Sequence, residues 1–186
     1  GGGESVMETA VLAGSGTYLS FRLGDEEFAA EISKVKEVLE YPVITKVPRM
    51  PAYVCGVTNL RGSVVPVVDM RQKFGMSSVE RTVDTCVIIL DVQLEGEAVT
   101  IGCLVDSVKE VFEMDASRIE APPRMGTCIN ADFLKGMGAL DEGFLMILDI
   151  DRVLSAEELL LVTGAAGAAA FQGGDEGGEA EADTEA

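Results

Sequence analysis

Paired carboxylates are the side chains of this sequence best suited to chemistry. Asp149 and Asp151 are separated by one residue, and two carboxylates at this spacing can bind a divalent cation or serve a hydrolase. At the junction between a strand and a helix, however, the pattern is more typical of a helix cap, and no nearby residue completes a ligand set. Asp69 also precedes a short helical pattern and is predicted to cap it. A carboxylate- or metal-dependent hydrolase is therefore only a remote alternative, and we expect no metal site.

Histidine, the usual side chain for proton transfer near neutral pH, is absent from all 186 residues. Its absence excludes His-based acid–base catalysis, His metal ligands and phosphorylation on His within this chain. The cysteines are far apart, with no pair spaced as in a zinc or thioredoxin-like site, and all but Cys128 lie in apolar runs: Cys55, Cys86, Cys103 and Cys128. Reduced, buried thiols in such runs behave as small hydrophobic groups. The sequence thus predicts no catalytic residue and no cofactor, and it favours a cytoplasmic location.

The charge balance argues against polyanionic partners. The formal net charge is -18, and six acidic residues with no basic one lie in 173–186, which leaves -12 on the rest of the chain. Nucleic acids and anionic membranes attract concentrated Lys and Arg, so we expect neither as a partner. The longest weakly polar run, Leu159–Phe171, has about 13 residues, whereas roughly 18 or more are needed to span a bilayer. We therefore expect no membrane insertion.

Arg61 lies at the tip of a predicted β-hairpin. Two β-rich runs flank Arg61 and Gly62, and the second run is almost wholly apolar from Val64 to Val68. Asp69 then begins a short helix that ends before Gly75. A guanidinium at a hairpin tip can bind carboxylates or carbonyls of a partner, although a tip arginine is more often simply solvated. The residues alone leave both possibilities open.

Short strands with frequent turns dominate the remainder of the chain. The predicted strands, besides the hairpin around Arg61, are Thr17–Leu23, Glu27–Glu31, Val43–Val47, Thr85–Leu94, Glu97–Val105, Val108–Met114, Phe133–Leu140 and Phe144–Asp149. The predicted helices, besides the one after Asp69, are Ser33–Leu39, a brief segment near Tyr53, and a segment from Ile150 through Leu161. Residues 118–126, with two prolines, are expected to form an extended connection. This pattern is mainly β and indicates small barrels or a sandwich, between which periodicity does not choose.

Several motifs resemble one protein family. The string Gly-Val-Thr-Asn-Leu-Arg-Gly at 56–62, followed by Pro-Val-Val-Asp-Met-Arg at 66–71, closely resembles the signature of CheW, the adaptor that couples bacterial chemoreceptors to the histidine kinase CheA. Similar segments occur in the same order at 24–28, 32–38 and 133–140. The resemblance spans roughly Thr17 to Thr163. It implies two intertwined, five-stranded SH3-like β-barrels with a groove between them, short helices and a C-terminal helix.

The resemblance divides the chain into three parts. Residues 1–16, small and rich in glycine, are expected to form a flexible N-terminal arm, and residues 17–163 the CheW-like domain with its two barrel subdomains. Residues 164–186 are rich in Gly, Ala and acidic side chains, and they contain too little apolar surface to order themselves. We expect this acidic tail to be disordered.

The resemblance also implies a surface for the chemoreceptor tip. The receptor-binding residues carried over from the family pattern are Val35, Glu37, Asn59 and Arg61. From the residues alone, Val35, within the predicted helix, is more simply a core position, because it lies three residues from both Ile32 and Val38. Glu37 is equally a solvated partner of Lys34.

A second surface is implied for the regulatory domain of CheA. Its residues are Val43, Ile44 and Thr45, on a β-branched segment that follows Pro42. Such a strand is usually covered or half-buried, and the resemblance instead gives it a docking role. Among the three residues, Ile44 is the favoured contact.

The function implied is that of a non-enzymatic adaptor, monomeric when free and recruited from the cytoplasm to membrane-associated receptor arrays. It would transmit receptor signals to the kinase by contact, because coupling needs two sites that favour the same arrangement of the adaptor. The alternatives are a CheW-like adaptor of a non-chemotaxis array and the regulatory domain of a CheA-like kinase. Free termini without flanking catalytic segments favour the standalone adaptor.

Overall fold

The computed structural model describes residues 15–122, 129–141, 143–164 and 166–167. The expected N-terminal arm, apart from its last two residues, therefore lies outside the described residues. So does the expected acidic tail, apart from 164, 166 and 167. The first strand begins at Ser15, two residues before the strand predicted from the sequence.

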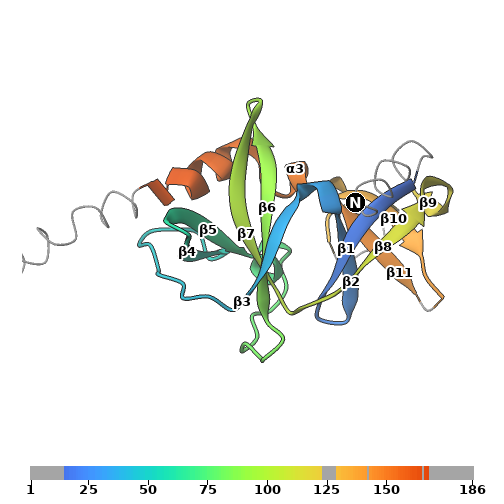
Figure 1. Cartoon of the computed structure of the whole chain (residues 1–186), viewed down its shortest axis with the longest axis horizontal. Helices are drawn as coiled ribbons and strands as arrows, with labels where there is room; N and C mark the ends of the chain where they lie inside the picture. Colours follow the sequence, from blue (N-terminus) through green and yellow to red (C-terminus); the bar gives the residue numbers. More distant parts are fainter. Residues whose placement is uncertain (1–14, 123–128, 142, 165, 168–186) are drawn as a thin grey trace, which may run out of the picture.

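Two curled sheets make up the fold (Figure 1). The first sheet has the order β8-β1-β2-β11-β10-β9, with β1 at Ser15–Leu23, β2 at Glu26–Glu31, β8 at Ser107–Asp115, β9 at Ile119–Glu120, β10 at Leu134–Ala139 and β11 at Phe144–Leu148. The second sheet has the order β3-β6-β7-β5-β4, with β3 at Val35–Glu40, β4 at Val54–Leu60, β5 at Ser63–Asp69, β6 at Cys86–Leu94 and β7 at Glu97–Val105. The short strand β9 gives the first sheet six strands instead of the five expected.

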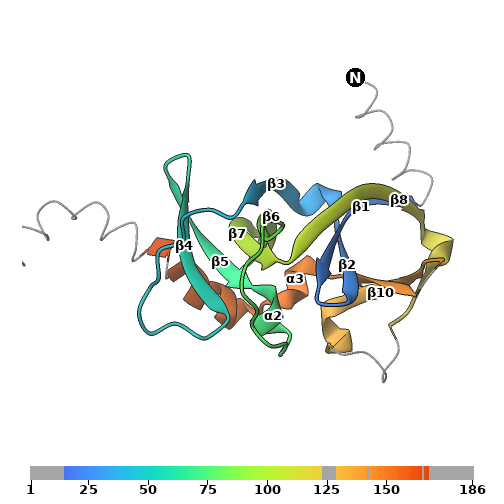
Figure 2. The same ribbon diagram turned by 90° about the horizontal axis from the view of Figure 1, so that it is seen from below.

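The chain passes between the sheets twice. It leaves the first sheet after β2, forms all five strands of the second sheet, and returns through β8. The passage from β2 to β3 is a single 3-10 turn, η1, at Ile32–Lys34. Each sheet contains one parallel pair, β2 with β11 and β5 with β7, and its other pairs are antiparallel. The intertwined arrangement expected from the family resemblance is therefore present (Figure 2).

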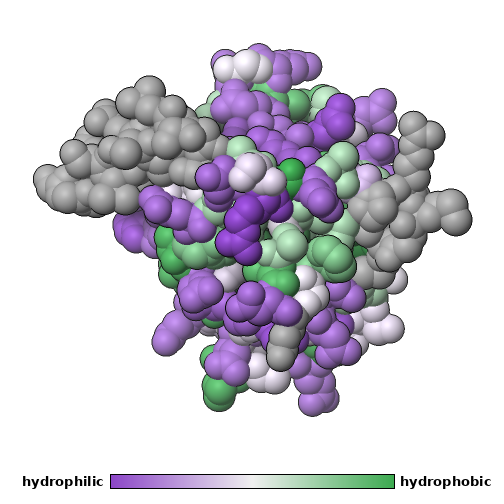
Figure 3. Space-filling model, turned by 90° about the vertical axis from the view of Figure 1, so that its right-hand side faces the viewer, coloured by the Kyte–Doolittle hydropathy of each residue, from purple (hydrophilic) through white to green (hydrophobic). Residues whose placement is uncertain are grey.

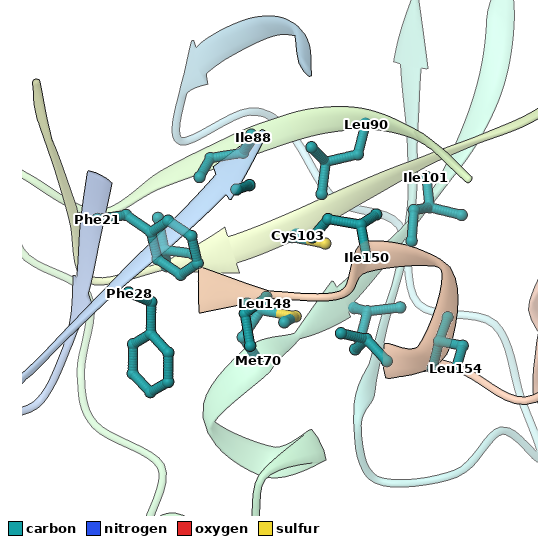
Figure 4. Packing of buried hydrophobic residues seen from close by; sticks show 14 of the residues in the cluster. Phe21, Phe28, Met70, Ile88, Leu90, Ile101, Cys103, Leu148, Ile150 and Leu154 are labelled. Atoms are coloured by element: carbon teal, nitrogen blue, oxygen red, sulfur yellow. The ribbon is translucent and has the colours of Figure 1, made fainter. Parts of the chain in front are cut away.

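Alternation along the strands supplies three apolar cores. Within β2, Phe28 and Ala30 face a central core that lies between the two sheets, whereas Ala29 faces a separate core of the first sheet. In β6, likewise, Ile88 and Leu90 face the central core, and the alternate residues face the core of the second sheet. The central core also receives side chains from the C-terminal region (Figure 4). Because β2 and β6 are buried on both faces, their central residues form continuous apolar runs.

Helical segments are short. Besides η1, they comprise α2 at Met70–Lys73, α3 at Ile150–Val153, a helix over 156–164, and the 3-10 turns η2 at Ala116–Arg118 and η3 at Ala131–Phe133. Asp69 caps α2, since its carboxylate accepts hydrogen bonds from the N–H groups of Arg71 and Gln72, which confirms the predicted cap. Among the described residues no helix has the length and apolar character needed to cross a membrane.

The predicted helix Ser33–Leu39 is wrong. After η1, residues from Val35 onward form the edge strand β3, which pairs with β6. The half-buried Val35, Glu37 and Leu39 alternate with exposed residues, so the burial has a period of two. The helical spacing of Ile32, Val35 and Val38 misled the prediction, because the side chain of Val38 is exposed.

Two further predictions need correction. The predicted strand Val43–Val47 is reduced to one antiparallel bridge between Thr45 and Val57, and the chain near Tyr53 forms turns instead of a helix. The predicted helix from Ile150 through Leu161 begins at the expected residue but is interrupted at Leu154, whose backbone is extended. A second helix then begins with a reciprocal cap, in which Ser155 and Glu158 each accept a hydrogen bond from the other's backbone N–H.

The predicted extended connection over 118–126 contains the short strand β9, and residues 123–126 of it lie outside the described residues. The surface of the six-stranded sheet mixes hydrophilic and apolar groups (Figure 3). Among the described residues of this sheet, Val111 and Phe144 are the large apolar side chains that are strongly exposed.

Candidate functional site

The β4–β5 hairpin ends in a tight turn at Arg61 and Gly62. Both residues have positive φ, 51° and 90°, as the two central positions of a type I′ turn require. The side-chain oxygen of Asn59 accepts a hydrogen bond of 2.8 Å from the N–H of Gly62. Asn59 therefore stabilises the turn that presents Arg61, which is a structural role in the candidate site.

Arg61 forms a two-pronged ion pair with Glu37. Nη1 of Arg61 donates to Oε2 of Glu37 at 2.6 Å, and Nη2 donates to Oε1 at 2.8 Å. The two residues come from β3 and the β4–β5 hairpin, which lie at opposite edges of the five-stranded sheet, so the pair forms where the curled sheet brings its edges together. The sequence did not predict this pairing, and its only signal was the opposite charge of two residues 24 positions apart.

The ion pair stabilises the charged form of both side chains. The hydrogen bond from Arg61 lowers the pKa of Glu37, and the same bond raises the pKa of Arg61. Arg61 nevertheless remains 72% exposed, because its partner occupies only one edge of the guanidinium. Other N–H groups of this side chain are thus available to acceptors on a partner protein.

A groove of about 470 Å³ lies beside this ion pair. Glu37 and Arg61 stand at its wall, and apolar side chains of β5 and β7 form much of its remaining lining. The lining residues are Lys36, Glu37, Leu60, Arg61, Ser63, Val64, Val65, Pro66, Val99, Thr100, Thr163 and Ala166. The groove thus combines an apolar surface with an exposed, fixed guanidinium.

Val35 does not line this groove. Its side chain is half-buried and packs against the central core, as the alternative interpretation from its spacing anticipated. Of the four residues predicted for receptor binding, the structure brings Glu37, Asn59 and Arg61 together and places Val35 on the adjoining part of β3.

The segment with Val43, Ile44 and Thr45 lies against β4. Thr45 exchanges two backbone hydrogen bonds of 2.8 Å with Val57, and the hydroxyl of Thr58 donates to the carbonyl of Val43 at 2.8 Å. The side chain of Val43 is 86% exposed, that of Thr45 is exposed, and that of Ile44 is half-buried against the core of the second sheet. The segment therefore presents Val43 and Thr45 outward, while Ile44 is largely structural.

A second cavity, of about 360 Å³, adjoins Ile44. Tyr41 and Arg81 form part of its wall, and the guanidinium carbon of Arg81 lies 4.2 Å from the centre of the Tyr41 ring. Val79, in the same loop as Arg81, is also exposed. The sequence predicted a polar connection over Ser77–Asp84 but not this contact between Arg81 and Tyr41, because the loop carries no periodic pattern.

The carboxylates considered for metal binding have structural partners. Asp149 caps α3, because its carboxylate accepts a hydrogen bond from the N–H of Asp151. Asp151 accepts hydrogen bonds from Nζ of Lys34 at 2.9 Å and from the N–H of Gln93 at 3.0 Å. Burial acts to raise the pKa of Asp151, but these bonds outweigh burial, and the pKa is lowered. Burial raises the pKa of Asp69 despite the bonds it accepts. In the described part of the chain, no group of three or more Cys, Asp or Glu side chains is arranged to hold a metal.

The comparisons with known proteins agree with this fold. The family model described as CheW-like domain matches residues 17–158. The chemotaxis protein CheW of Klebsiella aerogenes is 39% identical over 145 residues, which cover 78% of this chain and 85% of that protein. The chemotaxis protein CheW of Rhizobium meliloti is 33% identical over 140 residues, with 75% of this chain and 88% of that protein covered.

A solved structure extends the likeness to three dimensions. The crystal structure of the scaffolding protein TtCheW from Thermoanaerobacter tengcongensis matches with a TM-score of 0.71 and 31% sequence identity, covering 78% of this chain and 93% of that one. The two curled sheets with few short helices are thus the paired SH3-like barrels that the sequence motifs implied. The chain belongs to the CheW-like domain family.

Proposed function

We propose that this chain is a non-enzymatic adaptor that couples chemoreceptors to the histidine kinase CheA. The observation that carries the proposal is the Glu37–Arg61 ion pair at the wall of the apolar groove, in a chain of the CheW-like family. The adaptor acts in the cytoplasm, at receptor arrays on the membrane, and is monomeric when free.

The groove receives the tip of the receptor. The apolar side chains of its lining, such as Val64 and Val99, suit the apolar positions of a helical hairpin, and the exposed edge of Arg61 suits its carboxylates or carbonyls. Because Glu37 fixes the guanidinium, little side-chain entropy remains to be lost when a partner binds. Val35 contributes by supporting β3 from the core side.

The kinase docks on the segment that carries Val43 and Thr45. Val43 is the most exposed apolar side chain of this segment, and the backbone bonds of Thr45 and the Thr58 hydroxyl bond hold the segment against β4. Since β4 also leads into the Arg61 turn, both surfaces share one structural element. A receptor and a kinase that favour the same arrangement of this element would each strengthen the binding of the other.

Binding measurements with three variants test the proposal. A receptor cytoplasmic fragment and a CheA regulatory domain are titrated, separately and together, into the wild type, Arg61→Ala, Val43→Asp and Ile44→Asp. We expect Arg61→Ala to weaken receptor binding about tenfold or more, as loss of a charged contact does, and Val43→Asp to weaken kinase binding by a similar factor. Val43→Asp is the more decisive of the two kinase-side variants, because Ile44 is half-buried and its replacement disturbs the core.

Val111→Asp is the matched control, since Val111 is exposed on the other sheet. It should leave both affinities unchanged. If the folded wild type binds neither partner, the proposed function is wrong. If the wild type binds both but Arg61→Ala and Val43→Asp bind as the wild type does, the proposed binding surfaces are wrong.

A further inference from the structure

The C-terminal helix leads the chain to the rim of the groove. Leu159 and Val162 of this helix are 2% and 0% exposed in the central core, so the helix is firmly placed. Thr163 and Ala166 follow these two buried residues in the chain and are part of the groove lining. The polypeptide beyond 167 therefore starts beside the surface that we assign to the receptor.

The groove has a charge unlike that of the chain as a whole. Its charged lining residues are Lys36, Arg61 and Glu37, two basic against one acidic, whereas the chain carries -18. Lys36 is 51% exposed, and its ammonium lies 3.8 Å from Asp91, a long distance for an ion pair. With Arg61 also exposed, the groove offers two accessible cations above an apolar surface.

The segment 168–186 has the complementary composition. It contains six acidic residues, no basic residue, and one large apolar side chain, Phe171. Phe171 follows Ala166 by five residues. Five residues of extended chain span at most about 17 Å. Phe171 thus precedes the acidic residues and lies within reach of the groove that Ala166 lines.

We propose that segment 168–186 binds back into the groove as an intramolecular ligand and competes with the receptor. Phe171 contacts the apolar lining near Val64 and Val99, and the carboxylates that follow lie near Arg61 and Lys36. Tethering gives such a segment an effective concentration in the millimolar range, so a weak contact is sufficient for occupancy. The competition rests on the proposed receptor function, whereas the tail contact itself does not.

Amide NMR of the full chain tests the tail contact without any partner. In the test variant the six tail acids become amides: Asp175→Asn, Glu176→Gln, Glu179→Gln, Glu181→Gln, Asp183→Asn and Glu185→Gln. We expect the amide signals of Glu37, Arg61 and Val64 to shift in this variant, and also in the wild type when salt is raised to about 1 M, where the screening length falls to about 3 Å. Phe171→Ser should shift the same signals.

The matched control neutralises six exposed acids that do not line the groove: Asp25→Asn, Glu80→Gln, Asp84→Asn, Glu113→Gln, Glu120→Gln and Asp141→Asn. It changes the net charge equally and should leave the groove signals in place. A synthetic peptide of residues 168–186, added to the test variant, should move the signals back toward their wild-type positions. If the groove signals of the wild type and the test variant coincide, the tail contact is refuted.

Receptor binding tests the competition. If the tail occupies the groove nine-tenths of the time, the test variant binds a receptor fragment about tenfold more tightly than the wild type; at half occupancy the gain is about twofold. Equal affinities with a confirmed tail contact would refute the competition. If the fragment binds no variant, the proposed receptor function fails, and the NMR result still decides the tail contact.

Discussion

Glu37 and Arg61 form an exposed ion pair, and exposed pairs contribute little to folding stability because water and salt screen them. The importance of the pair lies in geometry. Arg61 has a positive φ in a turn that Asn59 holds, and Glu37 aligns the guanidinium across the closing edges of the sheet. A partner therefore meets a fixed donor instead of a mobile side chain.

Gly56 occupies a position where any side chain collides with the backbone. Its φ is 145°, and a Cβ added to it would lie 2.1 Å from the carbonyl oxygen of Thr45. We expect Gly56→Ala to lower the free energy of unfolding by about 3 kcal/mol, because the bridge between Thr45 and Val57 must open. Chemical denaturation measures the loss.

Gly62→Ala is the comparison for this prediction. Gly62 also has a positive φ, 90°, but nothing lies within 4 Å of an added Cβ. The strain of the left-handed backbone alone should cost about 1 kcal/mol. Equal losses for the two variants would show that the close approach of Thr45 is unimportant.

At the level of elements, the second passage between the sheets is fixed by one carboxylate. Asp106, between β7 and β8, accepts hydrogen bonds of 2.8 and 2.5 Å from Nε and Nη2 of Arg71, just after the start of α2. It also accepts a bond of 2.7 Å from the N–H of Gly24 in the β1–β2 turn. Asp106 thereby joins the two sheets at the point where the chain returns to the first.

The pH dependence of stability should report this junction. Burial acts to raise the pKa of Asp106, but the bonds from Arg71 and Gly24 outweigh it and lower the pKa. A carboxyl with a lowered folded-state pKa adds stability above its unfolded pKa, about 3.9, and loses it as the pH falls toward the folded value. We expect Asp106→Asn to cost about 2 kcal/mol at pH 7 and progressively less below about pH 4.

Denaturation of both proteins at a series of pH values between about 7 and 2.5 checks this prediction. Glu113→Gln, at an exposed position of β8, should match the wild type throughout. A cost of Asp106→Asn that stays constant down to the lowest pH would contradict the role of the ionised carboxylate.

Elements were predictable where local rules and burial agreed. The apolar runs of β5, β6 and β7 and the cap at Asp69 are local signals, and the structure confirms them. The edge strand β3 was not predictable, because two valines and an isoleucine at helical spacing mimicked an amphipathic helix while pairing with β6 decided the outcome. The family resemblance implied a groove between the two barrels, whereas the groove beside Arg61 is lined by the second sheet and the C-terminal helix. Its walls come from four separated parts of the chain, which no local pattern connects.

For the whole molecule, the central core makes one unit of the two sheets. A series of rings crosses it: Phe21 and Phe28 of the first sheet, Phe74 after α2, and Phe133 of η3, with neighbouring centroids 5.6–5.8 Å apart. Lys73 adds to this junction, since its ammonium lies 5.2 Å from the Tyr53 ring and 5.3 Å from the Phe133 ring and pairs with Glu158. Each sheet needs the other to bury the side chains that it contributes to this core.

The two sheets should therefore unfold together. Phe28 belongs to β2, is 0% exposed, and stacks on both Phe21 and Phe74. We expect Phe28→Ala to lower the free energy of unfolding by about 4 kcal/mol and to reduce the hydrogen-exchange protection of β6 and β7 amides as much as that of β1 and β2 amides. Phe144→Ala, at a 57% exposed position of the first sheet, should change both by less than about 0.5 kcal/mol. Loss of protection confined to the first sheet would mean that the two sheets are separate folding units.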